Sequence, residues 1–191
     1  MRLFIAIHLS VEIKSEAERM IEYLETAKAD VKWINKDALH ITLKFLGETD
    51  KSRVKGIIPL LTDIAGKTGP FSIVTGKAGA FPEINNPKTL FTGLSSGKDN
   101  IIALSKIIDG ILVKAAFKRE KEPFNPHITL GRVRSASNLV KLSESLLNAN
   151  YHEIEQKVDS FSLVKSELVG NKAVYKDLAE FKLTEKNTHN A

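Results

Sequence analysis

The tetrapeptide His40-Ile41-Thr42-Leu43 occurs a second time in this chain as His127-Ile128-Thr129-Leu130. Both copies are rich in residues that favour extended backbone, so each predicts a β-strand. Side chains on a strand alternate between its two faces, which places each histidine on one face with its threonine and the aliphatic residues on the other. The repeat therefore predicts two matched strands, each with a polar face toward a cleft and an apolar face toward a core.

The segments around the tetrapeptides also repeat, in the order strand, helix, histidine strand, helix, strand. The two histidines lie 87 positions apart (127 minus 40), and so do Phe4 and Phe91 (91 minus 4). The Phe-Ser strands at Phe71 and Phe161 lie 90 positions apart, which indicates a small insertion. We interpret this pattern as an internal duplication with an approximate two-fold axis that brings both histidines and both threonines to one central groove.

Apolar residues at helical spacing predict helices near residues 10–28, 54–64, 101–112 and 137–148. Extended runs predict strands near residues 1–7, 41–46, 71–74, 89–94, 128–130, 161–164 and 174–183, and a short segment over 31–34 leads to the first histidine strand. The proline- and asparagine-rich segment 81–87 predicts a surface connection, and Gly170-Asn171 predicts a hairpin turn. We expect a single bilobal domain over 1–183, with halves at about 1–85 and 86–183, and a polar tail over 184–191.

The composition is that of a globular protein, with 191 residues, 42% of them hydrophobic and 27% charged. The absence of cysteine excludes disulfides, thiolate metal sites and a cysteine nucleophile, and it is compatible with the expected cytoplasmic location. No apolar run approaches the ~20 residues that a bilayer requires, so no membrane partner is expected. The net charge of +5 favours an anionic partner such as RNA, although such an excess is also ordinary on soluble surfaces.

Two histidines with pKa values near ~6.5 can hold one neutral base and one protonated acid at the same time. This is the equipment of concerted acid/base displacement, and a threonine hydroxyl on the same face can donate a hydrogen bond to a phosphate oxygen. A metal site would need further ligands at matched positions, and none recurs, so neither a metal nor a cofactor is expected. Gly66-Lys67-Thr68-Gly69 lacks the spacing of a P-loop, and His8, His152 and His189 are interpreted as structural or surface residues.

The paired motifs resemble those of the two-histidine (HxTx) phosphoesterase superfamily. Three segments resemble its RNA 2′,3′-cyclic phosphodiesterase (2′-5′ RNA ligase-like) branch: Arg2–Ile7, His40–Gly47 and Pro126–Arg132. The resemblance implies an α+β fold with two antiparallel sheets flanking a central cleft and helices on the outside. It also implies metal-independent hydrolysis of a terminal RNA 2′,3′-cyclic phosphate to a 2′-phosphate, and it leaves reverse 2′-5′ ligation open.

By position in the family motifs, the resemblance implies that His40 is the proton donor to the departing 3′ oxygen and that His127 is the base that activates water. It also implies that Thr42 and Thr129 hold the phosphate oxygens. The motifs themselves are chemically alike, so from the residues alone the two histidine roles could be exchanged.

Three flanking residues are weaker candidates for substrate binding. Lys44 lies four residues after His40, on the same strand face, and could steer RNA or be an ordinary surface lysine. Arg132 lies five residues after His127, which places it on the opposite face of a regular strand. Phe45 and Trp33 could be core residues or platforms for base stacking.

Two other functions stay open at this point. One is a phosphodiesterase for small cyclic phosphates or 2′-5′ linkages, and the other is a non-catalytic module that binds RNA ends. A monomer is expected, and the physiological RNA cannot be read from the residues.

Overall fold

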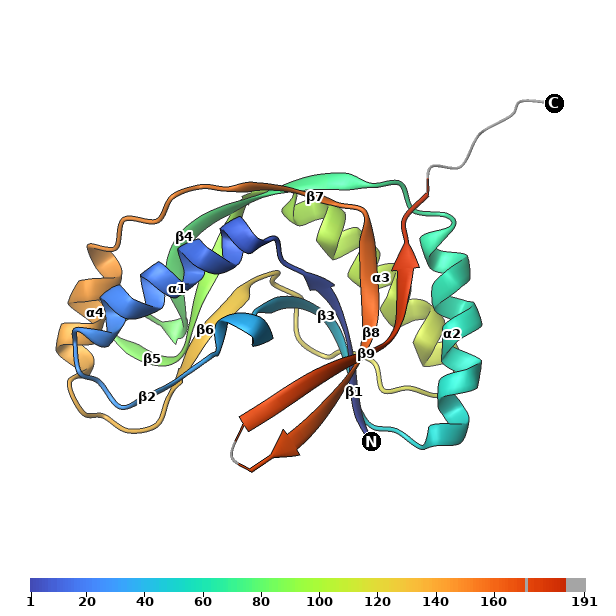
Figure 1. Cartoon of the computed structure of the whole chain (residues 1–191), viewed down its shortest axis with the longest axis horizontal. Helices are drawn as coiled ribbons and strands as arrows, with labels where there is room; N and C mark the ends of the chain where they lie inside the picture. Colours follow the sequence, from blue (N-terminus) through green and yellow to red (C-terminus); the bar gives the residue numbers. More distant parts are fainter. Residues whose placement is uncertain (171, 185–191) are drawn as a thin grey trace.

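All strands within the described residues belong to one antiparallel sheet of nine strands, which is strongly curved (Figure 1). The structure is a computed structural model that describes residues 1–170 and 172–184. The expected turn at Gly170-Asn171 lies partly outside these residues, as do His189 and most of the expected tail. The strands are β1 (Arg2–His8), β2 (Val31–Trp33), β3 (His40–Glu48), β4 (Phe71–Glu83), β5 (Asn86–Ser96), β6 (Ile128–Val133), β7 (Glu155–Val158), β8 (Ser160–Val169) and β9 (Lys172–Lys182).

The two histidine strands, β3 and β6, meet at the centre of the sheet. The strand order is β7-β4-β5-β6-β3-β1-β8-β9, with β2 paired to β6. The seam between β6 and β3 consists of a single registered pair, Ile41 and Ile128. The expectation of two antiparallel sheets is therefore refined, because the two sets of strands are joined at this seam into one sheet.

The strand order is symmetric about that seam. Exchanging β3 for β6, β1 for β5 and β8 for β4 reproduces the same sequence of neighbours on the other side. Strand β4 comes from the first half of the chain but pairs with β5 of the second, while β8 of the second half pairs with β1 of the first. The predicted halves thus exchange a strand, and the bilobal division of the domain stays a prediction. The order is the one that an internal duplication predicts, and the duplication itself stays a prediction.

Four α-helices within the described residues cover one face of the sheet: α1 (Val11–Glu25), α2 (Lys51–Ala65), α3 (Lys98–Lys114) and α4 (Leu139–Leu147). Helices α1 and α4 lie together at one end and α2 and α3 at the other (Figure 1). The helix α1 begins where expected because the Ser10 hydroxyl accepts a hydrogen bond from the Ile13 N–H at 3.3 Å. None of the described helices is both long and apolar enough to cross a membrane.

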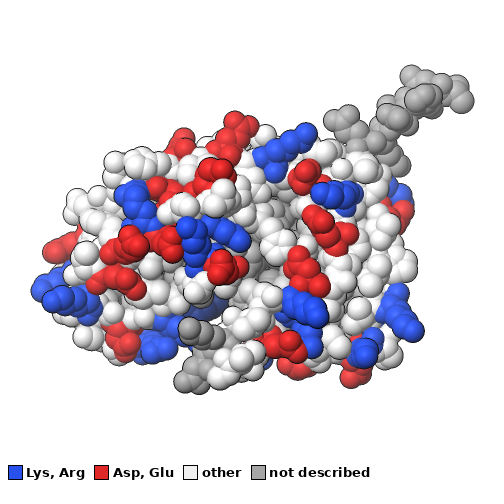
Figure 2. Space-filling model, in the orientation of Figure 1, with Lys and Arg blue, Asp and Glu red and all other residues white. Residues whose placement is uncertain are grey.

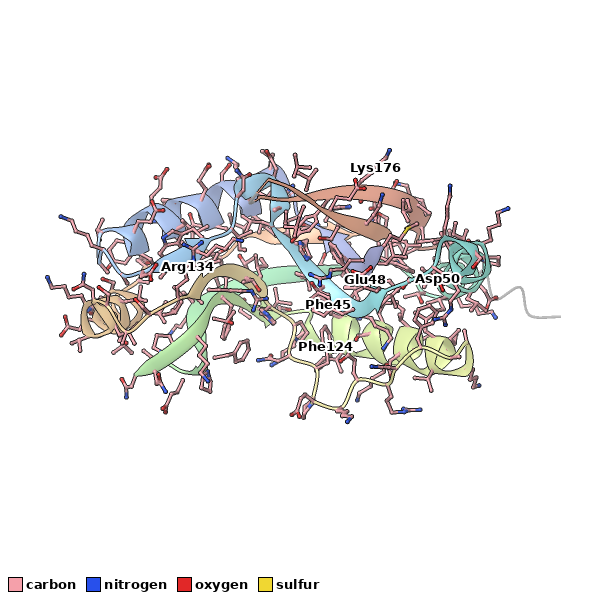
Figure 3. All side chains as sticks on the ribbon, turned by 90° about the horizontal axis from the view of Figure 1, so that it is seen from below. Phe45, Glu48, Asp50, Phe124, Arg134 and Lys176 are labelled. Carbon is pink, nitrogen blue, oxygen red and sulfur yellow. The ribbon has the colours of Figure 1, made fainter. Side chains whose placement is uncertain are left out.

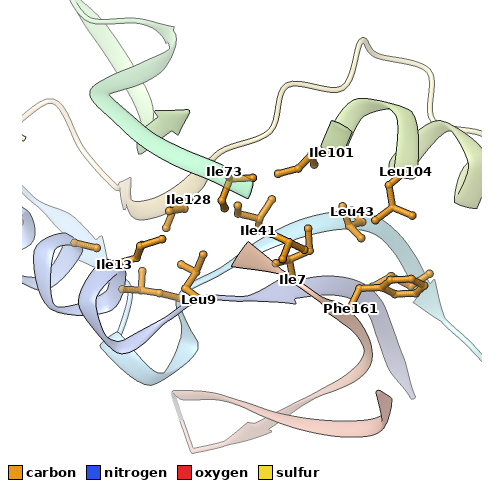
Figure 4. Packing of buried hydrophobic residues seen from close by; sticks show 14 of the residues in the cluster. Ile7, Leu9, Ile13, Ile41, Leu43, Ile73, Ile101, Leu104, Ile128 and Phe161 are labelled. Carbon is orange, nitrogen blue, oxygen red and sulfur yellow. The ribbon is translucent and has the colours of Figure 1, made fainter. Parts of the chain in front are cut away.

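One hydrophobic core fills the space between the helices and the sheet. Ile41 and Leu43 from β3 and Ile128 from β6 point into it, as the alternation of the tetrapeptides predicts (Figure 4). Ile7 of β1 and Ile101 of α3 belong to the same cluster, so both halves of the chain contribute to a single core. The opposite face of the sheet carries the polar residues of both tetrapeptides, and we call it the site face.

The structure differs from the expected elements in three places. The segment 81–87 is the end of a long β4–β5 hairpin, and only Ile84 and Asn85 form the turn. A short 3₁₀ helix (Lys36–Ala38) precedes β3, and β7 was not predicted. Strand β7 has a largely polar sequence and forms because it pairs with residues 71–74 of β4. A tertiary pairing of this kind leaves no periodic signal in the sequence.

Candidate active site

His40 and His127 lie on the site face, one on each side of the central seam. Each directly precedes a residue of the Ile41–Ile128 pair, whose side chains are buried in the core. Strand alternation therefore turns both imidazoles to the opposite face. Because Ile41 and Ile128 are directly paired, the two histidines that precede them lie on either side of the same point of the seam. The structure thus brings together the residues that the repeat predicted would share one site.

The two imidazoles are oriented by the same backbone contact. Nδ1 of His40 lies 2.7 Å from the carbonyl oxygen of Ala38, and Nδ1 of His127 lies 2.7 Å from that of Asn125. A carbonyl oxygen only accepts, so we infer that each Nδ1 carries the hydrogen. This leaves Nε2 of both rings as the nitrogen that can gain or lose a proton. For His40 this atom lies 2.9 Å from the Thr42 hydroxyl.

Aromatic side chains enclose both imidazoles. The His40 ring lies 4.8 Å from the Phe4 ring and 5.3 Å, edge-on, from the Tyr175 ring. The His127 ring lies 5.5 Å from the Phe91 ring and 5.1 Å from the Phe81 ring. Phe4 and Phe91 occupy matched positions in the repeat, whereas Phe81 and Tyr175 have no aromatic residue at a matched position. The sequence pattern therefore indicated only one aromatic neighbour for each histidine.

Burial lowers the pKa of both histidines below the ordinary value, because an apolar surrounding disfavours the charged imidazolium. The hydrogen bond from Nδ1 to a carbonyl opposes this effect in each case. The positive charge of Arg132 lowers the pKa of His127 further, and the charges of His8, His127 and Lys14 do the same for His40. Both imidazoles are therefore predisposed to the neutral form in the free protein.

A β-bulge in each histidine strand decides which flanking residues reach the site. In β3, Ala6 pairs with Thr42 and Ile5 with Lys44, so Leu43 has no partner. Directly paired residues point to the same face of a sheet. Lys44 is paired with the core residue Ile5, so its side chain points into the core and away from the site. The same irregularity occurs in β6, where Phe91 pairs with Thr129 and Leu90 with Gly131.

The bulges bring Phe45 and Arg132 to the site face. Phe45 pairs with Phe4 and Arg132 with Thr89, both of which lie on the site face of their strands. Phe45 is 62% exposed, and Figure 3 shows it between Arg134 on one side and Asp50 on the other. The prediction that Arg132 lies on the opposite face from His127 is therefore wrong. It assumed a regular strand, and the extra residue in the bulge places Arg132 on the same face as His127. The two residues occupy equivalent positions, five after their histidines.

Lys44 is not a substrate-binding residue in this structure. Its side chain is 1% exposed, and its ammonium donates to Asp109 Oδ1 at 2.6 Å and to the Lys118 carbonyl at 2.8 Å. The prediction that Lys44 steers RNA is wrong because it assumed a strand without a bulge. Trp33 packs closely over Gly131, where an added Cβ would lie 2.8 Å from its ring, so it is a packing residue.

The fold and the site define a class of protein with a symmetric sheet and a histidine pair on its exposed face. The chain belongs to the 2′-5′ RNA ligase superfamily, whose family model matches residues 12–170.

Curated relatives agree with this assignment. The chain is 34% identical to the RNA 2′,3′-cyclic phosphodiesterase of Methanocaldococcus jannaschii over 95% of this chain and all of that protein. It is 31% identical to the protein of the same name from Thermotoga maritima over 94% of each chain.

Solved structures show the same fold. TT0787 of Thermus thermophilus has a TM-score of 0.80 at 24% identity and covers 97% of this chain and all of its own. The apo form of E. coli LigT has a TM-score of 0.77 at 23% identity and covers 96% of this chain and 98% of its own. At these identities the likeness is one of fold.

Proposed function

We propose that this protein is an RNA 2′,3′-cyclic phosphodiesterase that opens a terminal cyclic phosphate to a 2′-phosphate. The observation that carries the proposal is the matched orientation of the two imidazoles. Each Nδ1–H is held by a carbonyl, so each Nε2 on the site face is available for proton transfer. The names of the curated relatives, which align over nearly the whole chain, support the same activity.

In the proposed reaction, His127 Nε2 takes a proton from water as the water oxygen attacks phosphorus. The bond between phosphorus and the 3′ oxygen breaks, and His40 Nε2–H donates its proton to that oxygen. The products are a 2′-phosphate and a free 3′ hydroxyl, with one proton moved from His40 and one gained by His127. The assignment of acid and base follows the family motifs, because the two histidines have the same backbone contact.

Four further residues are proposed to bind the substrate. The hydroxyls of Thr42 and Thr129 face the same side as the imidazoles and can donate to the non-bridging phosphate oxygens. Arg132 can stabilise the charge of the phosphate, which fits its effect on the pKa of His127. Phe45, largely exposed on the site face, offers a ring on which a base can stack.

The pH dependence of the reaction tests the histidine pair. One imidazole must be neutral and the other protonated, so kcat/KM is highest between their two pKa values. Because burial lowers both pKa values, we expect both limbs of the kcat/KM profile to lie below about pH 6.5. The rate rises as the base loses its proton and falls as the acid loses its own. A falling limb above about pH 8 would contradict this, since it would report an acid with a raised pKa.

Resistance to a chelator tests whether the histidine pair suffices. Within the described residues, no three His, Cys, Asp or Glu side chains are grouped as a metal site requires. We expect hydrolysis of an oligoribonucleotide with a 2′,3′-cyclic phosphate end to proceed at the same rate in EDTA. Loss of the activity in EDTA and its recovery on adding a divalent metal would contradict the mechanism.

Two alternatives are separated by the choice of substrate. A phosphodiesterase for small cyclic phosphates or 2′-5′ linkages would turn over a cyclic mononucleotide or a 2′-5′ dinucleotide faster than the oligonucleotide. A non-catalytic RNA-end binding module would bind the oligonucleotide without turnover.

On the face shown in Figure 2, basic and acidic side chains are interspersed, so the net charge forms no continuous basic surface there. Reverse ligation, a monomeric state and a cytoplasmic location stay predictions.

A further inference from the structure

The aromatic side chains beside His127 are held more firmly in place than those beside His40. Beside His127, Phe81 stacks on Phe91 with ring centroids 4.2 Å apart, and the β4–β5 hairpin is fastened to α4 where Ser143 donates to the Ile84 carbonyl at 2.6 Å. Beside His40, the second ring is Tyr175, which lies on β9. Among the described strands it is the last of the sheet, with β8 as its one neighbour.

Strand β9 begins in a hairpin whose end is poorly covered. Leu168, Val169 and Val174 are 74%, 64% and 46% exposed, and the β8–β9 hairpin extends away from the helices in Figure 1. An edge strand with an exposed end has few contacts to keep it in place. Tyr175 is next to Val174, and its ring packs edge-on against Phe4 with centroids 5.1 Å apart. A contact that also holds the backbone of β9 would keep this ring against His40.

A histidine and a carboxylate provide that contact. His8 Nε2 lies 2.8 Å from Oδ2 and 3.0 Å from Oδ1 of Asp177, and the Ser162 hydroxyl lies 3.3 Å from the same Oδ2. This pair joins β1 to β9 across the intervening β8. Asp177 is two residues after Tyr175 and shares its face, while His8 is paired directly with His40. The Asp177 carboxylate therefore holds β9 in place immediately beside the His40 ring, which Tyr175 contacts.

We propose that His8 and Asp177 form a positioning pair that holds Tyr175 against His40 and so fixes the imidazole for proton transfer. The inference rests on the proposed function for its kinetic consequence. A catalytic group displaced by about 1 Å can lose up to ~10²-fold in rate, so a loosened β9 lowers kcat. The substrate-binding residues on β3 and β6 stay in place, so KM changes little.

Kinetics of single and paired variants test the proposal. We expect Asp177→Ala and His8→Ala each to lower kcat by about tenfold, with KM within about threefold. His8→Gln keeps a donor near the position of Nε2 and should retain most of the activity. Combining Asp177→Ala with Tyr175→Ala should be no worse than Tyr175→Ala alone, because the carboxylate acts through the ring. Fully additive effects, or an unchanged kcat in Asp177→Ala, would overturn the proposal.

The matched control is Glu180→Ala, which removes another hydrogen-bonded pair of the same hairpin. Glu180 Oε1 accepts from Ser160 at 2.8 Å and neither residue contacts His40. We expect kcat to be unchanged in this variant. A tenfold loss there as well would show that any weakening of the hairpin lowers the rate, which would overturn a specific role for Asp177.

Nuclear magnetic resonance of the histidine rings tests the positioning without any substrate. In Asp177→Ala, we expect the ring signals of His40 to shift or broaden while those of His127 stay unchanged. An unchanged His40 signal would overturn the positioning pair whatever the activity. If the parent protein does not hydrolyse the cyclic phosphate, the proposed function fails, and the ring signals still decide the structural inference.

Discussion

Replacing His127 by alanine is expected to lower kcat for a 2′,3′-cyclic phosphate RNA end by about 10² to 10⁴-fold, and His40→Ala should have an effect of the same order. Each change removes one proton transfer from the displacement. The two histidines act in the same step, so the double variant should be little worse than either single one. Initial rates with a labelled oligonucleotide measure all three.

The control for these variants is an exposed histidine away from the site. His152 contacts Glu16, a buried residue of α1, through its ring and its backbone N–H, and His152→Gln should leave kcat unchanged. Circular dichroism should show that the alanine variants keep the parent fold. Parent-like turnover by folded His127→Ala would exclude this residue as the base.

Replacing Asp109 by leucine is expected to lower the free energy of unfolding by about 3 to 5 kcal/mol. The Lys44 side chain is 1% exposed and its nearest charge is Asp109 at 2.6 Å, while Glu120 is 3.9 Å away and half exposed. Without Asp109 the buried ammonium keeps the Lys118 carbonyl but lacks a close counter-charge. Urea denaturation monitored by Trp33 fluorescence measures the loss.

Two further variants show whether the loss comes from the unpaired charge. In Lys44→Met combined with Asp109→Leu, most of the stability should return, because both charged groups are gone. The exposed pair of Asp63, near the end of α2, and Lys67, just after it, is the control, and Asp63→Asn should cost less than about 1 kcal/mol. An equally small cost for Asp109→Leu would contradict a structural role for the buried pair.

Elements with a clear period were predictable from the sequence. The stripe of apolar residues in 10–28 corresponds to α1, and the alternation at each tetrapeptide correctly places Ile41 and Ile128 in the core. Strand β7 was not predictable, because its four residues form a strand only through pairing with β4. The prolines and asparagines of the 81–87 segment predicted a connection, but all of it except Ile84 and Asn85 is paired within the β4–β5 hairpin. This pairing, like that of β7, leaves no periodic signal in the sequence.

The two polar pairs of the site were predictable because they depend on a separation of two within a strand, which no later irregularity disturbs. Lys44 and Arg132 were misplaced because their separation from the histidines crosses a bulge. Tyr175 and Asp177 lie near His40 only because β9 folds back beside β8 at the far end of the chain, and His8 lies there because β1 pairs with β3.

The sequence by itself determined the paired histidines and threonines, the helices and the apolar faces, because each depends on the local period of a strand or helix. Only the tertiary structure decided that β4 and β8 change sides, that β3 and β6 meet at one residue pair, and which residues follow the bulges onto the site face. These features depend on pairing between distant strands. A bulge shifts one strand by a single residue against its neighbour, and in a structure with a period of two that shift exchanges the two faces.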